Sequence, residues 1–177
     1  MQVEVFIQSQ INQSFKDKLT NLNWYPAGIG PQIWKNWFKT WLESLQSHIP
    51  PAPSYELGML LTSDKEIQIL NANYRFQNNP TDVLAFATLE VEYPKSKDML
   101  SSMPLSLGDI IISVETAQRQ AQRQEHRLLT ELAWLATHGL LHLLGWEHRD
   151  EYTLQVMFHQ QVELLNKVGI TIEFDPL

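Results

Sequence analysis

Three histidines in the second half of the chain have the spacing of a metal site. They are His138, His142 and His148, in the segment HGLLHLLGWEH. Residues four apart lie on one face of a helix with Cβ atoms about 5–6 Å apart, so the first two imidazoles are neighbours. Gly145 can leave the helix in a left-handed conformation, and the turn then returns His148 toward the pair. The pattern predicts an open three-histidine site, the arrangement typical of a catalytic zinc ion.

The same offsets occur in the metzincin peptidases, whose motif is H-E-x-x-H-x-x-G-x-x-H. Those enzymes carry a glutamate that activates water at the position where this chain has Gly139. A peptidase with that mechanism would lack its general base. The spacing therefore predicts a metal-dependent hydrolytic site and leaves a metallopeptidase-like amide hydrolase as the weaker alternative.

The composition is that of one globular domain, which we expect to span residues 1–177. The chain has no cysteine, so a metal must be held by histidine and carboxylate groups. A net charge of −7 disfavours a large nucleic-acid surface but leaves room for a local basic groove or a basic protein partner. Neither a signal peptide nor a membrane span is indicated, and we expect a cytoplasmic protein.

The elements that must position the histidines form an α+β pattern. Apolar runs rich in β-branched residues predict strands at residues 3–7, 56–62, 82–88 and 107–113, with a short one at 170–174. An apolar stripe with three tryptophans predicts a helix over residues 31–48 that packs on the sheet.

Other stretches predict the remaining helices and one long loop. Ser63 and Asp150 are expected to cap helices. Residues 128–144 are apolar almost all round, which predicts a buried central helix that carries the metal ligands. Residues 90–106 are irregular, and loops of this length often serve as functional flaps.

Several segments together resemble the YbeY-type endoribonucleases of ribosomal RNA maturation. HGLLHLLGWEH is similar to their H-G-x-L-H-L-x-G-Y-D-H, with Trp146 and Glu147 in place of Tyr and Asp. NANYRFQNNPTDVLAF resembles N-x-x-Y-R followed by P-T-D-V-L-S-F, with Ala85 in place of serine. LGDIIIS and EHRLLTEL are also similar to family segments. The resemblance covers about residues 55–168, whereas residues 1–54 match only in outline.

The resemblance implies a zincin-like mixed β-sheet packed against helices, with one Zn²⁺ ion held by His138, His142 and His148. It further implies a single-stranded ribosomal precursor RNA as substrate, the small ribosomal subunit or a ribosomal protein as partner, and no DNA. Arg75 matches an arginine of the family's basic cleft, where a guanidinium can bind two phosphate oxygens.

We therefore expect a zinc-dependent, single-strand-specific endoribonuclease acting in small-subunit ribosomal RNA processing and ribosome quality control. Its expected catalytic residues are Arg75, His138, His142 and His148. The general base stays open: Glu147 is the nearest carboxylate in sequence, but it equally suits support of a metal-bound histidine. The attacking group is either water or the ribose 2′-hydroxyl. A further alternative is a non-catalytic ribosome-assembly factor with structural zinc, which would require a fourth protein ligand.

Overall fold

The computed structural model describes residues 1–21, 30–89 and 102–172. Within these residues a four-stranded sheet has the order β1-β2-β4-β3. Its strands are β1 (Val3–Ser9), β2 (Tyr55–Thr62), β3 (Val83–Ala87) and β4 (Leu105–Ser113). The first three in spatial order run parallel, and the edge strand β3 is antiparallel to β4. The expected α+β class with a mixed sheet is confirmed.

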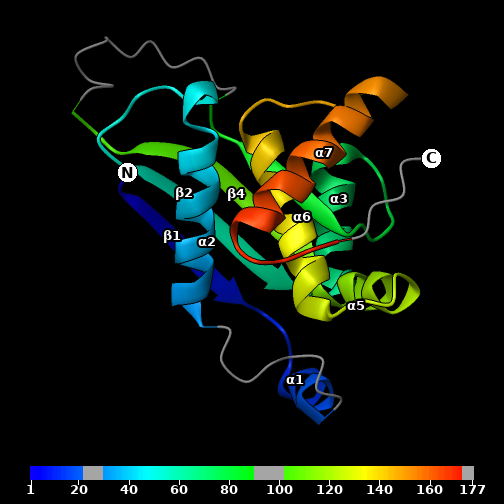
Figure 1. Cartoon of the computed structure of the whole chain (residues 1–177). Coiled ribbons are helices and arrows are strands. Elements are labelled where there is room, and N and C mark those ends of the chain that lie inside the picture. The colour runs from blue at the N-terminus through cyan, green and yellow to red at the C-terminus, as the bar shows by residue number, and fades with distance from the viewer. Residues whose placement is uncertain (22–29, 90–101, 173–177) are drawn as a thin grey trace.

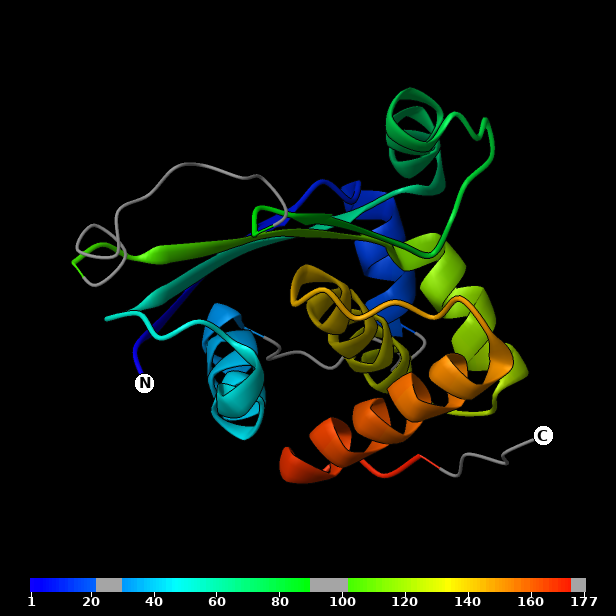
Figure 2. The ribbon, with the colours of Figure 1, turned by 90° about the horizontal axis from the view of Figure 1, so that it is seen from above.

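The helices lie mainly on one face of this sheet (Figures 1 and 2). They are α1 (Gln13–Asn21), α2 (Pro31–Ser44), the 3₁₀ helix η1 (Gln46–His48), α3 (Asp64–Arg75), α5 (Val114–Arg123), α6 (Leu128–Leu143) and α7 (Glu151–Lys167). In Figure 2, α2 and α6 lie beneath the sheet with α7 below α6, and α3 lies on the opposite side. None of the described helices is long and apolar enough to cross a membrane.

The tryptophan-rich helix α2 belongs to the core, as its apolar stripe predicts. Trp34, Phe38 and Trp41 are almost completely buried. The Trp41 indole Nε1–H donates a hydrogen bond to the Leu164 carbonyl of α7 at 2.9 Å, so its polar group is also satisfied. Helix α6 packs on β3 and β4 and also contacts α5 and α7, which makes it the central helix of the domain (Figure 1).

The predicted helix over residues 31–48 ends at Ser44 and is followed by η1, and larger differences concern the predicted loop and the predicted C-terminal strand. Strand β4 begins at Leu105, inside the predicted loop, because Leu105 donates its backbone N–H to Ser54 at 2.9 Å and pairs with β2. The rest of that loop, residues 90–101, lies outside the described residues. Residues 170–172 do not form the predicted strand, since Ile170 and Ile172 pack against the core without a partner strand. Residues 173–174 lie outside the described part.

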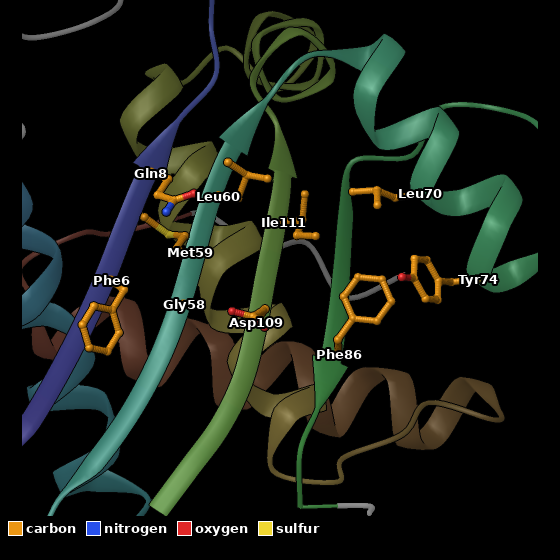
Figure 3. Close-up of a pocket in the computed structure, with 10 residues that line it drawn as sticks. All are labelled: Phe6, Gln8, Gly58, Met59, Leu60, Leu70, Tyr74, Phe86, Asp109 and Ile111. Carbon is orange, nitrogen blue, oxygen red and sulfur yellow. The ribbon is translucent and has the colours of Figure 1, made fainter. Parts of the chain in front are cut away.

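The sheet face opposite α6 is only partly covered. Helix α3 packs there, and Figure 3 shows its Leu70 and Tyr74 beside Ile111 and Phe86 of the sheet. A cavity of ≈ 480 Å³ lies along this face. At the far edge, on β1, the Phe6 ring is 60% exposed. The two faces of the sheet thus have different environments, and on this face α3 reaches the edge strand β3 through the contact between the Tyr74 and Phe86 rings.

The Asp64 carboxylate joins α3 to β4 and α5. Its Oδ1 accepts hydrogen bonds from the hydroxyls of Ser113 and Thr116, both at 2.6 Å, and its Oδ2 accepts one from Arg119 at 2.8 Å. Partial burial acts to raise the pKa of Asp64, but these hydrogen bonds and the Arg119 charge outweigh it, and the pKa lies below its ordinary value. These bonds fix the N-terminal end of the helix that ends at Arg75.

Replacing Asp64 by asparagine is expected to destabilise the fold by about 1–2 kcal/mol at neutral pH, because a charged acceptor becomes neutral. Since the folded-state pKa is lowered, the contribution of Asp64 is full above its unfolded pKa of about 4. It is lost as the pH falls through the lower folded-state value. Urea unfolding of the two proteins should therefore differ at neutral pH and converge in acid. Asp17→Asn, an exposed change on α1, is the control, and a difference that persisted in strong acid would contradict this role.

Candidate metal centre

The three predicted histidines lie together at the C-terminal end of α6. The Nε2 atoms of His138 and His142, one helical turn apart, are separated by 3.1 Å. The ring centroid of His148 lies 5.4 Å from that of His138 and 5.2 Å from that of His142. One ligand atom of each residue lies within 4.8 Å of those of the other two. The side chains therefore converge on one point.

The turn after α6 has the conformation that the glycine predicts. Helix α6 ends at Leu143, and Gly145 adopts a left-handed φ of 84°. The Gly145 N–H donates to the His142 carbonyl at 3.0 Å, and the Trp146 N–H donates to the Leu141 carbonyl at 3.0 Å. These bonds satisfy the last carbonyls of the helix while the chain reverses direction. The reversal places His148 opposite the two helical imidazoles.

The two imidazoles on α6 have the protonation state and the spacing that a metal ion requires. Burial, together with the neighbouring His138, His148 and Arg75, lowers the pKa of His142 to about 4. Burial also lowers the pKa of His138. Both rings are therefore neutral at neutral pH, and neutral imidazole is the ligand form. Two histidine nitrogens that bind one tetrahedral zinc ion lie about 3.3 Å apart. The Nε2 atoms of His138 and His142 are 3.1 Å apart, close to that separation.

The described residues place no further histidine or carboxylate in this group of ligands. A divalent ion held by three histidines would therefore keep an open coordination position on the side of the adjoining cavity. This open position disfavours a purely structural zinc site. The donor set fits a borderline ion such as zinc better than a hard ion such as magnesium, which prefers oxygen ligands.

A cavity of ≈ 340 Å³ adjoins the histidines and contains Arg75. It is lined by Arg75, Ala85, Ala87, His142, Trp146, Glu147, His148 and Arg149. Arg75 is the last residue of α3, and the alanines belong to the edge strand β3. The Arg75 charge also helps to lower the pKa of His142, which lines the same cavity. Within the described residues no carboxylate forms an ion pair with Arg75. Its guanidinium is therefore available to an anion in the cavity.

Comparison with known proteins assigns the chain to a protein family. A family model described as Endoribonuclease YbeY matches residues 19–169. A protein of that name from a Nostoc species is 54% identical over 172 residues, which make up 97% of this chain and 93% of the relative. Another from Trichodesmium erythraeum is 60% identical over 136 residues, or 77% of this chain and 74% of the relative. The chain belongs to the endoribonuclease YbeY family.

The resemblance drawn from the histidine segment and from residues 71–86 is thus confirmed, and so is the endoribonuclease class. The solution structure of a Thermotoga maritima protein shares the fold, with a TM-score of 0.53 at 22% identity. That likeness covers 93% of this chain and 89% of the other. The YbeY family assignment rests on the sequence matches, and the Thermotoga structure supports the fold alone.

The close approach of α6 to the sheet explains why this YbeY chain has glycine where the metzincins have glutamate. A Cβ atom at Gly139 would lie 2.7 Å from Cγ2 and 3.2 Å from Cγ1 of Ile110, a fully buried residue of β4. A glutamate side chain at position 139 would force the helix away from the strand. The peptidase base therefore has no room at this position, which disfavours the amide-hydrolase alternative on structural grounds.

Gln161 of α7 orients the first histidine, and the sequence analysis did not identify it. Its side chain is fully buried, and its amide nitrogen donates to the Trp134 carbonyl at 3.1 Å. The amide oxygen therefore faces His138 and accepts from Nδ1–H at 3.1 Å. This tautomer leaves the His138 Nε2 lone pair directed at the centre. The sequence did hold a signal for this role: Gln161 follows Met157 by four residues, so a polar side chain lies within the apolar face of the last helix.

Replacing Gln161 by leucine is expected to lower metal affinity about 10–100-fold, because the His138 ring loses the acceptor that fixes its tautomer. Gln161→Glu keeps an acceptor for Nδ1–H and should retain most of the affinity. Competition with a chromogenic chelator measures the change, and NMR of the imidazole nitrogens reports the His138 tautomer. Gln160→Leu, whose amide has no hydrogen bond within the described residues, is the matched control. Unchanged affinity in folded Gln161→Leu would contradict this role.

Glu147 and Arg149 form an ion pair at the exposed side of the cavity. A hydrogen bond from Arg149 and its positive charge lower the pKa of the Glu147 carboxyl, so this group is ionised. The pairing neutralises much of the Arg149 charge in the resting protein. Glu147 thus lies in the cavity, as its place in the sequence indicates, but it is held by an arginine instead of by a histidine.

Proposed function

We propose that this YbeY-family chain is a zinc-dependent endoribonuclease that cleaves single-stranded RNA during maturation of the small-subunit ribosomal RNA. The observation that carries the proposal is that Arg75 and two of the converging histidines line one cavity. A cationic guanidinium beside a three-histidine group suits an anionic phosphodiester and has no comparable use for a neutral amide. The family name supports RNA as the substrate class.

The proposed architecture is one domain over residues 1–177, with a zincin-like sheet and the metal site on α6. Its support is the packing of α6 against β3 and β4, which fixes the helix beneath the sheet. The acidic net charge of −7 is compatible with a cytoplasmic protein that docks on a basic ribosomal protein of the small subunit. Arg75 would then supply local positive charge where the RNA enters.

A zinc ion bound at this site would supply Lewis acidity toward a phosphoryl oxygen and lower the pKa of a water molecule. Arg75 would bind the scissile phosphate and stabilise the charge that develops on its oxygens. Gln161 holds the proton on His138 Nδ1, which keeps Nε2 available as a ligand. Ala85 and Ala87 present short side chains to the cavity and leave space for a nucleic-acid backbone. The nucleophile is water or the ribose 2′-hydroxyl.

Cleavage of a labelled single-stranded RNA tests this proposal. Zinc-loaded protein should cleave the strand, chelator-treated protein should not, and added zinc should restore cleavage. The same sequence annealed to its complement should be cut far more slowly. Product ends identify the nucleophile, since a 2′,3′-cyclic phosphate requires attack by the ribose hydroxyl. Equal cleavage before and after complete metal removal would overturn the metal-dependent mechanism.

A further inference from the structure

Phe76 is an exposed aromatic residue in a strained backbone conformation. It follows the last residue of α3 with φ 59° and ψ 29°, in the left-handed region. That region costs a residue with a side chain about 1–2 kcal/mol, and a bulky residue there is an outlier. Its side chain is 91% exposed, so packing does not offset the strain. A bulky apolar ring at such a position is what needs a reason, and strain kept at an exposed site points to a functional role for the ring.

The helix end itself does not require a phenylalanine. The Phe76 backbone N–H donates to the Asn71 carbonyl, and the Gln77 N–H reaches the same oxygen at 3.3 Å. Any residue can supply these backbone groups, and glycine or asparagine would do so with less strain. The ring is therefore unnecessary for closing α3.

Phe76 directly follows Arg75, the residue that brings a cationic group to the histidine cavity. Its neighbour Arg75 lines that cavity together with Ala85 and Ala87 of β3. On the other side of Arg75, the Tyr74 ring is 64% exposed and meets Phe86 of β3 edge to face, with centroids 5.1 Å apart (Figure 3). Aromatic residues thus flank the arginine in the chain at the edge of the sheet.

We propose that Phe76 stacks on an unpaired base of the RNA, next to the phosphate bound by Arg75. This inference rests on the proposed ribonuclease function. Single strands are recognised largely by stacking of their bases on aromatic rings, combined with cationic contacts to the backbone. Phe76 supplies the ring and Arg75 the cation, at adjacent positions. Bases inside a duplex have no free face for the ring, so the pair would favour single-stranded substrates without reading their sequence.

Steady-state cleavage of a short single-stranded RNA by the zinc-loaded protein tests this role. In Phe76→Gly, KM should rise about fivefold to tenfold, the lower range for the loss of one stacked base, with kcat nearly unchanged. Phe76→Tyr should behave as the wild type because it keeps the ring. The midpoint of thermal unfolding of Phe76→Gly should rise by about 2 °C, since the backbone strain is relieved.

A base analogue gives a readout that is independent of turnover. The fluorescence of 2-aminopurine, placed next to the cleaved phosphate, should be quenched on binding to the wild type and less so with Phe76→Gly. Phe6→Ala removes another exposed ring, from β1 at the opposite edge of the sheet, and should change neither KM nor quenching.

The outcomes separate this inference from the function on which it rests. A wild-type protein that does not cleave RNA would overturn both. A wild type that cleaves, with the same KM in Phe76→Gly, would overturn the stacking role alone. An unfolding midpoint that fell in Phe76→Gly would show a structural role for the ring and would also overturn the inference. Equal KM increases in Phe76→Gly and Phe6→Ala would show that the effect is not local to Phe76.

Discussion

Replacing His142 by alanine is expected to abolish both metal binding and RNA cleavage. His142 lies beside both other histidines, with ring centroids 4.6 Å from His138 and 5.2 Å from His148. Two remaining imidazoles form a poor site, because a catalytic zinc ion is normally held by three protein ligands. Loss of an outer partner costs about 10–100-fold in affinity, so loss of a ligand should exceed about 100-fold. Cleavage at micromolar zinc should fall to background.

Metal content after dialysis and cleavage of single-stranded RNA measure the effect of His142→Ala. The fold should survive, since the His142 ring is only partly buried. Unfolding measurements on the metal-free wild type and variant check this. His159→Ala is the matched control, because His159 is an exposed histidine of α7 outside the converging group. A His142→Ala protein that retained stoichiometric zinc would refute the ligand assignment. One that lost zinc but cleaved normally would refute the metal's role in catalysis.

Local rules explain why the histidine group could be predicted from the sequence. The separation of His138 and His142 follows from helical periodicity, and the return of His148 follows from the backbone freedom of Gly145. The strands were predicted with boundary errors because alternation and β-branched content are also local signals. The tryptophan stripe of α2 identified its buried face for the same reason. Each of these predictions depends on residues close together in the chain.

Features that depend on tertiary packing were missed. Helix α1 was not predicted, since residues 13–21 lack a sustained apolar stripe. Gln161 takes its role from the approach of α7 to α6, which no local pattern encodes. The contact between Gly139 and Ile110 likewise requires the position of β4. Arg75 could be assigned to the cavity only through the family resemblance, because α3 and α6 are far apart in the sequence.

Helix α6 serves both the fold and the site. Its packing against β4 requires Gly139, and this close approach brings the histidine face toward the edge strand β3. The same strand contributes Ala85 and Ala87 to the cavity and Phe86 to the opposite face. A substitution that shifted α6 on the sheet would therefore change the distance between the histidines and Arg75. The packing of α6 on the sheet thus sets how His138 and His142 lie relative to Arg75.

Replacing Arg75 by glutamate is expected to reduce kcat/KM for single-stranded RNA by about 10²–10³-fold, while zinc content stays unchanged. Removing one group that stabilises transition-state charge typically has an effect of this size. Reversing the charge adds repulsion between the carboxylate and the phosphate. Arg75→Lys should recover only part of the activity, since an ammonium is a point charge and cannot form the two parallel hydrogen bonds of a guanidinium. Cleavage assays and metal analysis on the same preparations measure both quantities.

The control for Arg75→Glu is Arg123→Glu, on the exposed surface of α5. It makes the same change in net charge at a residue that does not line the histidine cavity. Long-range repulsion of RNA would weaken both variants similarly and would fade as salt screens the field. A local phosphate contact predicts a large loss of kcat in Arg75→Glu and almost none in Arg123→Glu. Equal losses that disappear at high salt would show that Arg75 acts only through the overall charge, and would remove it from the proposed mechanism.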